Sequence, residues 1–193
     1  MKERTWHRMI LGDSRHMNEV EDKSVHLVVT SPPYWQLKDY GVKDQIGFND
    51  SYKDYVDNLN MVWKECNRVL HPGCRFCINI GDQFARAIFY GGNKVIPIRT
   101  EIIKYCESIG FDYMGAIIWQ KITTCQTTGG ATSKAALDLN RNSAGYEINK
   151  DYLEIIKSKI GIFDEPPLFR EDFDYEIIFQ EESLHSVPRY YPE

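Results

Sequence analysis

The sequence predicts an α/β fold in which a central, mostly parallel sheet carries helices on both faces. One observation is Val25–Thr30, a short apolar run rich in β-branched residues that is typical of a strand inside a parallel sheet. Another is the alternation of amphipathic helical stretches with further strand-like runs, which is the pattern of β-α units. A chain of 193 residues, 42% of them hydrophobic, is long enough for one globular domain with a core.

The first expected strand, Arg8–Leu11, runs into Gly12-Asp13-Ser14. An aspartate directly after a strand can reach a ligand at the carboxyl edge of a sheet, and it can equally cap the segment that follows. Local chemistry leaves both interpretations of Asp13 open.

The second expected strand ends abruptly in the loop Ser31-Pro32-Pro33-Tyr34-Trp35. Two consecutive prolines remove two backbone donors and fix two φ angles, so this loop is rigid and extended. It offers a hydroxyl group, carbonyl groups that no neighbouring N–H occupies, and two aromatic rings. Such a set can accept two hydrogen bonds from a flat amine while a ring stacks on its plane. A Pro-Pro turn that merely ends a strand is the alternative.

Two helices are predicted from apolar residues that recur at intervals of three and four. The first spans Tyr52–Leu70, with Asp50 or Ser51 as its N-cap. Its expected core-facing residues are Tyr55, Val56, Leu59, Val62, Trp63, Cys66, Val69 and Leu70. The second helix spans Ile98–Ile109.

Two further strands follow these helices. The sequence H-P-G ends the first helix, and a buried strand is expected over Cys74–Ile80. Asp82 comes just after it and is more typical of a turn than of a site. Phe111–Lys121 is expected to form a strand or a hairpin. The polar stretch Lys38–Asp50 is a loop that could close over a substrate, although such loops usually only connect elements.

The cysteines and the hydropathy pattern bear on location and on metals. Five cysteines, an odd number, fall mostly on expected core elements, which suits the reducing cytoplasm. Cys74 and Cys77 form a C-x-x-C in a strand-like run without a second pair, so no zinc site is expected. No apolar run reaches membrane length and Met1–Arg8 is polar, so we expect neither a membrane span nor a signal peptide.

The formal net charge of −5 arises from the C-terminal residues, because the rest of the chain has a small positive charge. Asp164–Glu193 carries nine acidic residues and two arginines, a net charge of −7, and leaves 19 acidic and 21 basic residues before it. We therefore divide the chain into a domain over residues 1–163 and an acidic tail over residues 164–193. A tail this negative should lie away from any nucleic acid. A solvated end is equally consistent, and Tyr175–Phe179 could add an edge strand.

The stretch Gly130–Ile148 has the pattern of the second half of a nucleotide-binding β-α-β unit. A glycine opens a short helix over Ala131–Leu139, and a strand over Ala144–Ile148 carries Glu147 near its end. Glycine permits close backbone approach, the helix N-terminus favours polar ligand groups, and a carboxylate at a strand end accepts hydrogen bonds from ribose hydroxyls. A purely structural role for Glu147 is the alternative. A closing helix follows, capped by Asn149.

These segments together resemble one family. T-S-P-P-Y-W after a short strand resembles motif IV of the DNA methyltransferases that modify exocyclic amino groups, in the serine form associated with cytosine N4. Gly12-Asp13-Ser14 is similar to motif III, near the cofactor adenine. Gly130-Ala131-Thr132 resembles the end of motif I, the S-adenosylmethionine loop, and Gly145-Tyr146-Glu147 resembles motif II. The catalytic motif precedes the cofactor loop, which resembles the β arrangement of these enzymes.

The resemblance implies a Rossmann-like methyltransferase fold. It implies transfer of a methyl group from S-adenosylmethionine to N4 of a cytosine flipped out of double-stranded DNA, in a restriction–modification system with a cognate restriction endonuclease. The catalytic loop would comprise Ser31, Pro32, Pro33 and Tyr34, and the residues at the substrate base would be Tyr34 and Trp35. The cofactor contacts would come from Asp13, Ser31, Gly130, Thr132 and Glu147.

Two questions stay open. Serine rather than aspartate at position 31 favours cytosine N4, with adenine N6 as the alternative. The first half of the β-α-β unit and the target-recognition region of the family are missing near residues 123–130. Either residues are absent from this sequence there, which we favour because both flanks are intact, or the chain carries a natural deletion. A true deletion would leave a non-catalytic remnant or a binding module.

Overall fold

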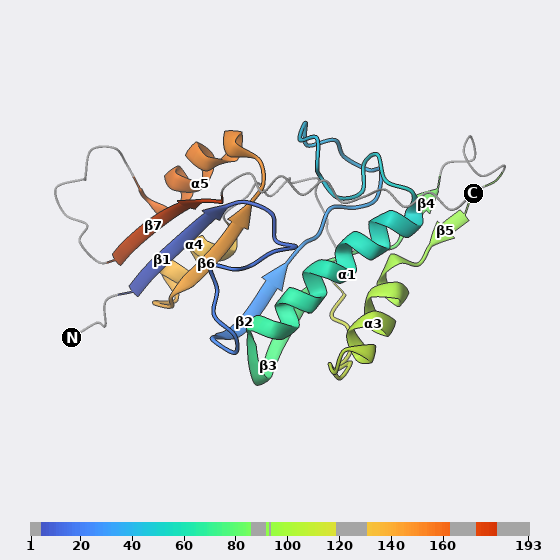
Figure 1. Ribbon diagram of the computed structural model, residues 1–193, viewed down its shortest axis with the longest axis horizontal. Coiled ribbons are helices and arrows are strands. Elements are labelled where there is room, and N and C mark those ends of the chain that lie inside the picture. Colours follow the sequence, from blue (N-terminus) through green and yellow to red (C-terminus); the bar gives the residue numbers. More distant parts are fainter. Residues whose placement is uncertain (1–4, 86–91, 93, 119–130, 163–172, 181–193) are drawn as a thin grey trace.

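The strands of the computed structural model form three separate ladders (Figure 1). The structure describes residues 5–85, 92, 94–118, 131–162 and 173–180. In the first ladder β1 (Thr5–Leu11) runs parallel to both of its neighbours, β6 (Ser143–Glu147) and β7 (Phe173–Phe179). In the second, β2 (Val25–Thr30) runs parallel to β3 (Leu70–Ile78). The third is a short antiparallel hairpin of β4 (Gln83–Ala85) and β5 (Lys94–Ile96).

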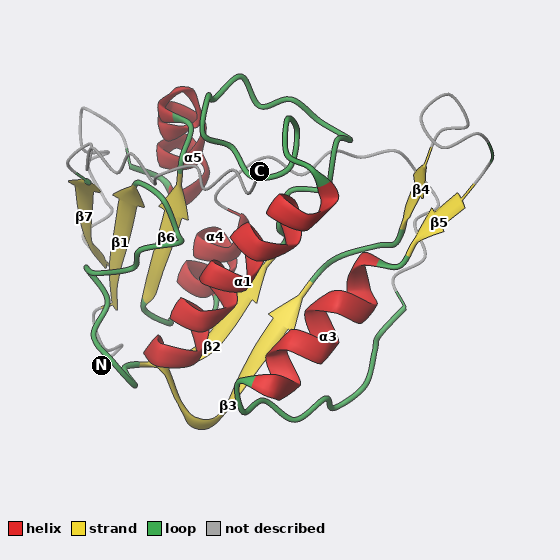
Figure 2. Ribbon diagram, turned by 45° about the vertical axis from the view of Figure 1, so that its right-hand side comes forward, coloured by secondary structure: helices red, strands yellow, loops and turns green. Residues whose placement is uncertain are grey.

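Helices cover the two parallel ladders from opposite sides. The helices α1 (Tyr52–Val69) and α3 (Ile98–Ser108) pack on β2 and β3, whereas α4 (Ala131–Asp138) and α5 (Leu153–Ile160) pack on the β1 ladder (Figure 2). In β1, Met9 packs against α5. Its neighbour Ile10 points the other way, beside Tyr146, which packs against the α1 cluster. Parallel strands with helices on both faces confirm the predicted α/β class.

The helix α1 supplies most of the main core. Its N-cap is Ser51, whose Oγ accepts a hydrogen bond from the Asp54 backbone N–H at 3.1 Å. The Trp63 ring is 1% exposed and lies 5.4 Å from the Phe76 ring on β3. The helix ends one residue before its predicted end, and its buried residues are Tyr55, Leu59, Val62, Trp63, Cys66 and Val69. The predicted apolar stripe is therefore confirmed.

The prediction that β2 is a buried strand in the middle of a sheet is wrong. Among the described residues β2 pairs only with β3, and β6 pairs only with β1, so each is the end strand of its ladder. Figures 1 and 2 show β2 as the next strand beyond β6, with no other described strand drawn between them. One face of β2 packs under α1 through Val28, while Leu27 and Val29 on the other face are 55% and 44% exposed. Leu27 and Val29 are exposed because no described helix covers this second face of β2.

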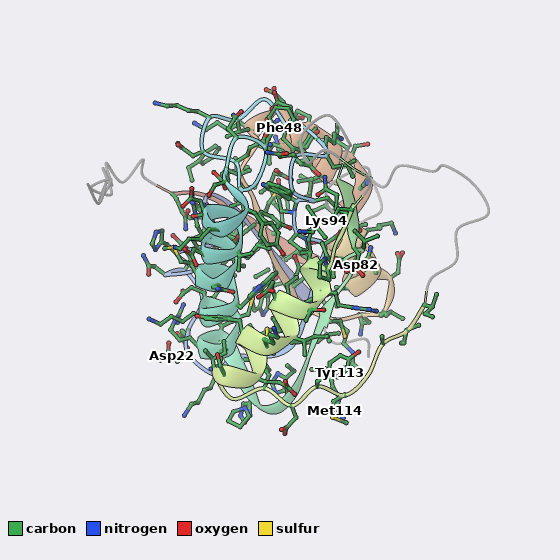
Figure 3. All side chains as sticks on the ribbon, turned by 90° about the vertical axis from the view of Figure 1, so that its right-hand side faces the viewer. Asp22, Phe48, Asp82, Lys94, Tyr113 and Met114 are labelled. Atoms are coloured by element: carbon green, nitrogen blue, oxygen red, sulfur yellow. The ribbon has the colours of Figure 1, made fainter. Side chains whose placement is uncertain are left out.

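Other elements differ from expectation in smaller ways. Phe111–Ile118 has no regular secondary structure, contrary to the predicted strand, and the last three residues of that prediction lie outside the described part. The side chains of Tyr113 and Met114 project from this segment into solvent (Figure 3). The hairpin of β4 and β5 was not predicted. The expected edge strand in the acidic tail is confirmed as β7, although most of the tail lies outside the described residues.

Two absences concern the described residues only. Within them, no helix is long and apolar enough to cross a membrane. No group of three or more His, Cys, Asp or Glu side chains in that part of the chain is placed to hold a metal ion. Cys74 and Cys77 lie three residues apart on β3 and therefore point to opposite faces of the strand.

Replacing Trp63 by alanine should strongly destabilise the protein, because it empties the centre of the α1 core. We expect a loss of about 3–5 kcal/mol in the free energy of unfolding, measured by urea denaturation. Met61→Ala on the same helix is the matched control, since Met61 is 42% exposed, and it should change stability by less than about 0.5 kcal/mol. Equal effects of the two substitutions would contradict this description of the core.

Candidate functional site

The Pro-Pro loop lies at the carboxyl end of β2, with its parts at different depths. Ser31 is exposed, whereas Pro32 is buried. The carbonyl of Pro33 accepts a hydrogen bond from the Tyr55 hydroxyl of α1 at 2.9 Å. The Tyr34 ring lies against Gly81, just after β3, since a Cβ atom built on Gly81 would be 3.7 Å from Tyr34 Cε1. The core thus anchors the loop from below and leaves the serine open to solvent.

Trp35 does not fit the role that the sequence suggested for it at the substrate base. The side chain is 3% exposed and belongs to the core cluster around α1. Its Nε1 donates to the Asp50 carbonyl at 3.0 Å, and its ring meets that of Tyr52 edge-on at 5.2 Å. A ring held on all sides by protein cannot stack on a base. Trp35 instead fixes the end of the loop to the core.

Asp13 and Glu147 come together at the carboxyl ends of β1 and β6. Leu11 and Glu147 are register partners, and the Gly12 N–H donates to the Glu147 carbonyl at 3.0 Å. Asp13 Oδ2 accepts from Arg15 Nε at 2.7 Å, and Oδ1 accepts from the Arg15 backbone N–H at 2.9 Å. The bond to the Arg15 backbone N–H closes a turn, and no helix follows that turn. Asp13 therefore does not cap a helix.

The carboxyl group of Glu147 is half-buried at this edge. Burial raises its pKa above the usual glutamate range, and hydrogen bonds from the backbone N–H groups of Asn149 and Ile148 partly oppose that rise. The bond from the Asn149 N–H to Glu147 Oε1 measures 3.0 Å. A side chain in this position can accept hydrogen bonds from a polar ligand, and it does so best when ionised.

The loop after Trp35 connects the Pro-Pro loop to the part of the site that contains Glu147. Its Tyr40 carbonyl accepts a hydrogen bond from Asn149 Nδ2 at 3.0 Å. Burial is the main cause that raises the pKa of Tyr40, and the nearby Tyr152, Glu147 and Tyr34 raise it further. The Tyr40 hydroxyl is therefore close enough to Tyr34 and to Glu147 to feel the charge of either side chain. The loop Lys38–Asp50 therefore spans the two ladders rather than only connecting elements.

A second polar connection runs through Arg15. Its Nη1 donates to Asn58 Oδ1 on α1 at 2.8 Å, and Asn58 Nδ2 donates to Asp50 Oδ2 at 3.2 Å. The same Asp50 oxygen accepts from the Gly47 N–H at 2.8 Å. This chain of hydrogen bonds links Asp13 with the loop that Trp35 anchors. The two sides of the site are thereby held in one arrangement.

Thr132, another predicted cofactor residue, lies at the start of α4. Thr132 is exposed in the first turn of that helix. The first turn lies close to β6, because a Cβ atom on Gly145 would be 3.3 Å from Ser133 Oγ. Gly130 lies outside the described residues. The structure thus brings Asp13, Glu147 and the Pro-Pro loop to one edge of the parallel strands. It does not test the prediction for Gly130.

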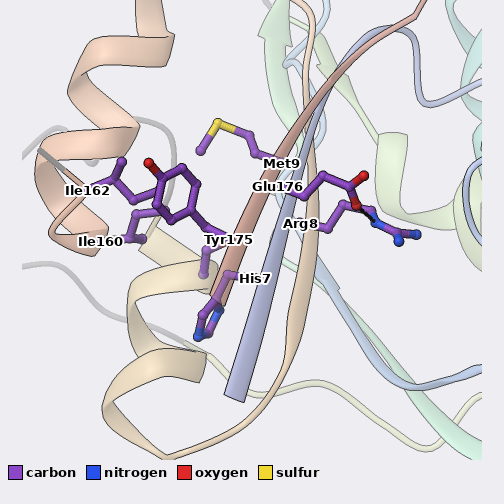
Figure 4. Close-up of a pocket in the computed structure, with 8 residues that line it drawn as sticks. His7, Arg8, Met9, Ile160, Ile162, Tyr175 and Glu176 are labelled. Carbon is purple, nitrogen blue, oxygen red and sulfur yellow. Dashed lines mark hydrogen bonds and ion pairs between the residues drawn. The ribbon is translucent and has the colours of Figure 1, made fainter. Parts of the chain in front are cut away.

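A pocket on the β1 ladder is separate from this edge (Figure 4). It opens between the middle of β1, β7 and the end of α5, and its lining residues include His7, Met9, Ile160 and Tyr175. It has room for little more than a water molecule. We interpret it as a packing gap rather than a ligand site.

Several residues that shape the site escaped prediction from sequence. Tyr55 was recognised only as core, because helical periodicity identifies a buried face but not a hydrogen bond made at its edge. Tyr40 and Arg15 lie in polar loops without a distinctive motif. Arg15 follows the candidate Asp13 by two residues, and that short spacing of opposite charges is the one local signal that could have identified it.

The hydrogen bond between Tyr55 and Pro33 can be tested with a matched pair of hydroxyl deletions. Tyr55→Phe should cost about 1–2 kcal/mol in the free energy of unfolding, because it leaves a carbonyl group unsatisfied beside the core. The Tyr52 hydroxyl is buried and finds no partner among the described residues, so Tyr52→Phe should be neutral or stabilising. Thermal unfolding of both variants measures the difference. A larger loss for Tyr52→Phe would contradict these assignments.

Comparison with known proteins adds sequence evidence. Residues 25–129 match the family of N6 and N4 methyltransferases described as DNA methylase. The Type II methyltransferase M.MjaI of Methanocaldococcus jannaschii is 36% identical over 141 residues, which are 61% of this chain and 46% of that protein. M.SfiI of Streptomyces fimbriatus is 40% identical over 94 residues, 48% of this chain and 22% of the relative. This chain spans less than half the length of these curated relatives.

A solved structure supports the same fold. The crystal structure of a candidate DNA modification methylase from Thermus thermophilus, complexed with S-adenosyl-L-methionine, superposes with a TM-score of 0.63 and 23% identity. The match covers 91% of this chain and 99% of that one, and at this identity it bears on the fold alone. The sequence match covers more than half of the 193 residues, including the Pro-Pro loop. This protein belongs to the DNA methylase family of N6 and N4 methyltransferases.

Proposed function

We propose that this chain is the catalytic part of a site-specific DNA methyltransferase that uses S-adenosylmethionine and acts on the exocyclic N4 of a flipped-out cytosine in duplex DNA. The observation that carries the proposal is the Pro-Pro loop at the carboxyl end of β2, which leaves Ser31 exposed and Tyr34 beside Gly81 at the edge where Asp13 and Glu147 meet. In parallel α/β sheets this edge is where ligands bind. Membership of the DNA methylase family supports the reaction class.

The proposed chemistry follows from the poor nucleophilicity of an amine whose lone pair is delocalised into a ring. Ser31 Oγ and the Pro32 carbonyl would each accept a hydrogen bond from the N4 amine, which favours a pyramidal nitrogen and frees the lone pair. The Pro33 carbonyl is already occupied by Tyr55, which holds the loop in place for this task. Stacking on Tyr34 would offset part of the cost of removing the base from the duplex. Tyr34 alone takes this role, since Trp35 is buried.

The cofactor supplies an activated methyl group on a sulfonium centre. Glu147 would accept hydrogen bonds from the two ribose hydroxyls, and Asp13 would lie by the adenine. Gly130 and Thr132 would line the approach at the start of α4, and Ser31 would border the methyl group. In-line transfer then needs mainly alignment and exclusion of water. N4 would gain the methyl group as the carbon–sulfur bond breaks and leaves a neutral thioether, and the methylated amine would then release a proton to solvent. The half-buried carboxylate of Glu147 fits the ribose role.

The choice of base rests on position 31. A serine hydroxyl is a neutral acceptor and favours cytosine N4, whereas an aspartate would be the stronger, charged acceptor usual for adenine N6. Adenine N6 is the alternative, because the matched family includes both activities. The expected partners are duplex DNA and a cognate restriction endonuclease, and the expected location is the cytoplasm. The acidic tail would lie away from the DNA.

One observation favours a different class of function. Among the described residues β6 and β2 are both end strands, and nothing pairs with the edges they turn toward each other. A nucleotide-binding unit normally has a strand before its helix, and the segment before α4 is the predicted site of the missing region. If that region is truly deleted, the chain is a non-catalytic remnant or a binding module. It would then hold the cofactor weakly and recognise no DNA sequence.

Methyl transfer to DNA is the decisive assay. Protein is incubated with labelled S-adenosylmethionine and mixed-sequence duplex DNA, and the DNA is digested to nucleosides for mass analysis. We expect N4-methylcytosine, and Ser31→Ala should lower turnover by about 100-fold while cofactor affinity changes little. The control is Ser24→Ala, which changes the residue just before β2 and should leave turnover unchanged. Ser24 lies at the other end of the strand, where its hydroxyl bonds to the Glu21 carbonyl at 2.7 Å.

The other outcomes of this assay separate the alternatives. N6-methyladenine would keep the enzyme class and overturn the choice of base. Absence of label in DNA, from protein that binds S-adenosylmethionine, would favour the remnant. Full activity of Ser31→Ala would contradict the role of that hydroxyl.

Cofactor binding should depend on pH through Glu147. The raised pKa means that the folded protein favours the protonated carboxyl group of Glu147. The contribution of this group to the free energy of unfolding therefore falls as pH rises through that pKa, because the charged form is the one that burial disfavours. The ribose hydroxyls need the ionised form, so affinity should fall as pH drops through the same range, which begins above the usual glutamate pKa. Glu147→Gln should bind roughly 10-fold more weakly and lose this dependence, as measured by calorimetry. Glu154→Gln, which removes an exposed carboxylate on α5, is the control and should behave like the unmodified protein.

A further inference from the structure

Gln180 connects the end of the C-terminal strand to the loop that carries Asp13. Its backbone N–H donates to the Leu11 carbonyl at 2.9 Å, which extends the pairing of β7 with β1 by one step. Its side-chain Oε1 accepts a hydrogen bond from the Asp13 N–H at 2.6 Å. Its Nε2 donates to the His16 carbonyl at 2.8 Å and to Glu19 Oε2 at 3.0 Å. One amide side chain thus holds three points of the segment 13–19.

The same contact extends to β6. Glu19 Oε2 also accepts a hydrogen bond from the Tyr146 hydroxyl at 3.0 Å, and the Glu19 carbonyl accepts one from Arg8 Nη1 at 3.0 Å. Burial and the bond to Glu19 both raise the pKa of Tyr146, so its hydroxyl remains a donor. Gln180 and Tyr146 therefore share one carboxylate oxygen. That shared oxygen ties the segment 13–19 to the strand that carries Glu147.

Gly12 provides the space for this arrangement. A Cβ atom on Gly12 would lie 1.8 Å from Gln180 Oε1 and 2.1 Å from Cδ. The Gly12 φ angle is not in the left-handed region, so other residues could adopt its backbone conformation. Glycine is required here for room rather than for chain geometry. An alanine would displace the flexible side chain of Gln180 and break all three of its bonds.

We propose that Gln180 is a positioning residue for the cofactor site, because it fixes the segment 13–19 and so holds Asp13 beside Glu147. This assignment rests on the proposed function. It gives the C-terminal strand a part in the site, although that strand belongs to the acidic tail. A loop held in its binding conformation loses less conformational entropy when a ligand arrives. The role of Gln180 should therefore show in cofactor affinity more than in global stability.

The test compares Gln180→Ala, Gly12→Ala and the double variant in the full chain. Calorimetry gives the dissociation constant for S-adenosylmethionine, and hydrogen exchange gives the protection of the amides of residues 13–19. Each single variant should bind roughly 10-fold more weakly and exchange these amides faster. The double variant should be no worse than Gln180→Ala, because Gly12→Ala acts by displacing the same side chain.

A control on the same strand separates positioning from general damage to β7. Glu176→Gln removes the exposed ion pair with Arg8, at 2.8 Å, which also joins β7 to β1. It should leave both cofactor affinity and exchange at residues 13–19 unchanged. In steady-state assays Gln180→Ala should raise the KM for S-adenosylmethionine while kcat at saturation changes little, whereas a merely structural defect would lower the active fraction and leave KM unchanged.

The remaining outcomes overturn the assignment in distinguishable ways. If the unmodified protein binds S-adenosylmethionine and Gln180→Ala binds it within twofold as tightly, the positioning role is wrong and the proposed function stands. Weaker cofactor binding with unchanged hydrogen exchange at residues 13–19 also contradicts the positioning role. In that case Gln180 would affect affinity without changing the order of this segment. Additive effects of Gly12→Ala and Gln180→Ala contradict the shared mechanism. If the unmodified protein binds no S-adenosylmethionine, the proposed function fails and the assignment fails with it.

Discussion

Burial of the apolar face of α1 holds the two parallel ladders together. The helix packs on β2 and β3, and the same cluster includes Tyr146 of β6. Within the described part of the chain no backbone ladder joins β6 to β2, so side-chain packing rather than strand pairing connects the two ladders. The burial of Trp63 and Tyr55, at 1% and 0% exposed, shows how completely this packing is made. The helix therefore sets the relative position of the strand ends on which the site is built.

Polar side chains of α1 extend this control to the loops. The Tyr55 hydroxyl fixes the Pro-Pro loop, and Asn58 joins Arg15 to Asp50. On the opposite side of the site, Asn149 holds the Tyr40 carbonyl. The bond from Arg15 to Asn58 and the bond from Asn149 to Tyr40 connect segments that follow different strands. The candidate site is thus one connected set of loops at a common edge, and its geometry depends on the helix beneath it.

Among the described residues no strand pairs with the facing edges of β6 and β2, and the surfaces near these edges are exposed. Leu27 and Val29 are exposed on a strand whose composition suits a buried position, and α4 contributes no fully buried residue. Both facts are expected where the described part of the chain provides no strand and no covering helix between the ladders. The chain also spans less than half the length of its curated relatives. Membership of the DNA methylase family is therefore compatible with the two separate parallel ladders of the described residues.

Features that depend on local sequence could be predicted closely. The periodicity and cap of α1 identified its bounds to within one residue, and α3 likewise, because helical hydrogen bonds and capping involve residues only a few positions apart. Two prolines were sufficient to predict an extended loop after β2. The candidate residues Asp13 and Ser31 were identified from their places directly after predicted strands, Tyr34 from the loop that follows, and Glu147 from the end of its own predicted strand. The family resemblance suggested their roles. Such positions can be predicted because short stretches of sequence show where a strand ends and in which direction the chain runs.

Tertiary structure decided the features that depend on distant partners. The burial of Trp35 depends on Tyr52 and Asp50 across a loop, and the role of Gln180 depends on contacts with residues more than 160 positions away. The exposure of β2 depends on which strands pair with it, and a strand-like composition does not name its neighbours. The sequence by itself therefore determined the α/β class, the helices and the residues at the strand ends. Only the folded chain decided which of those residues meet, because strand pairing and side-chain contacts join parts of the chain that no local pattern connects.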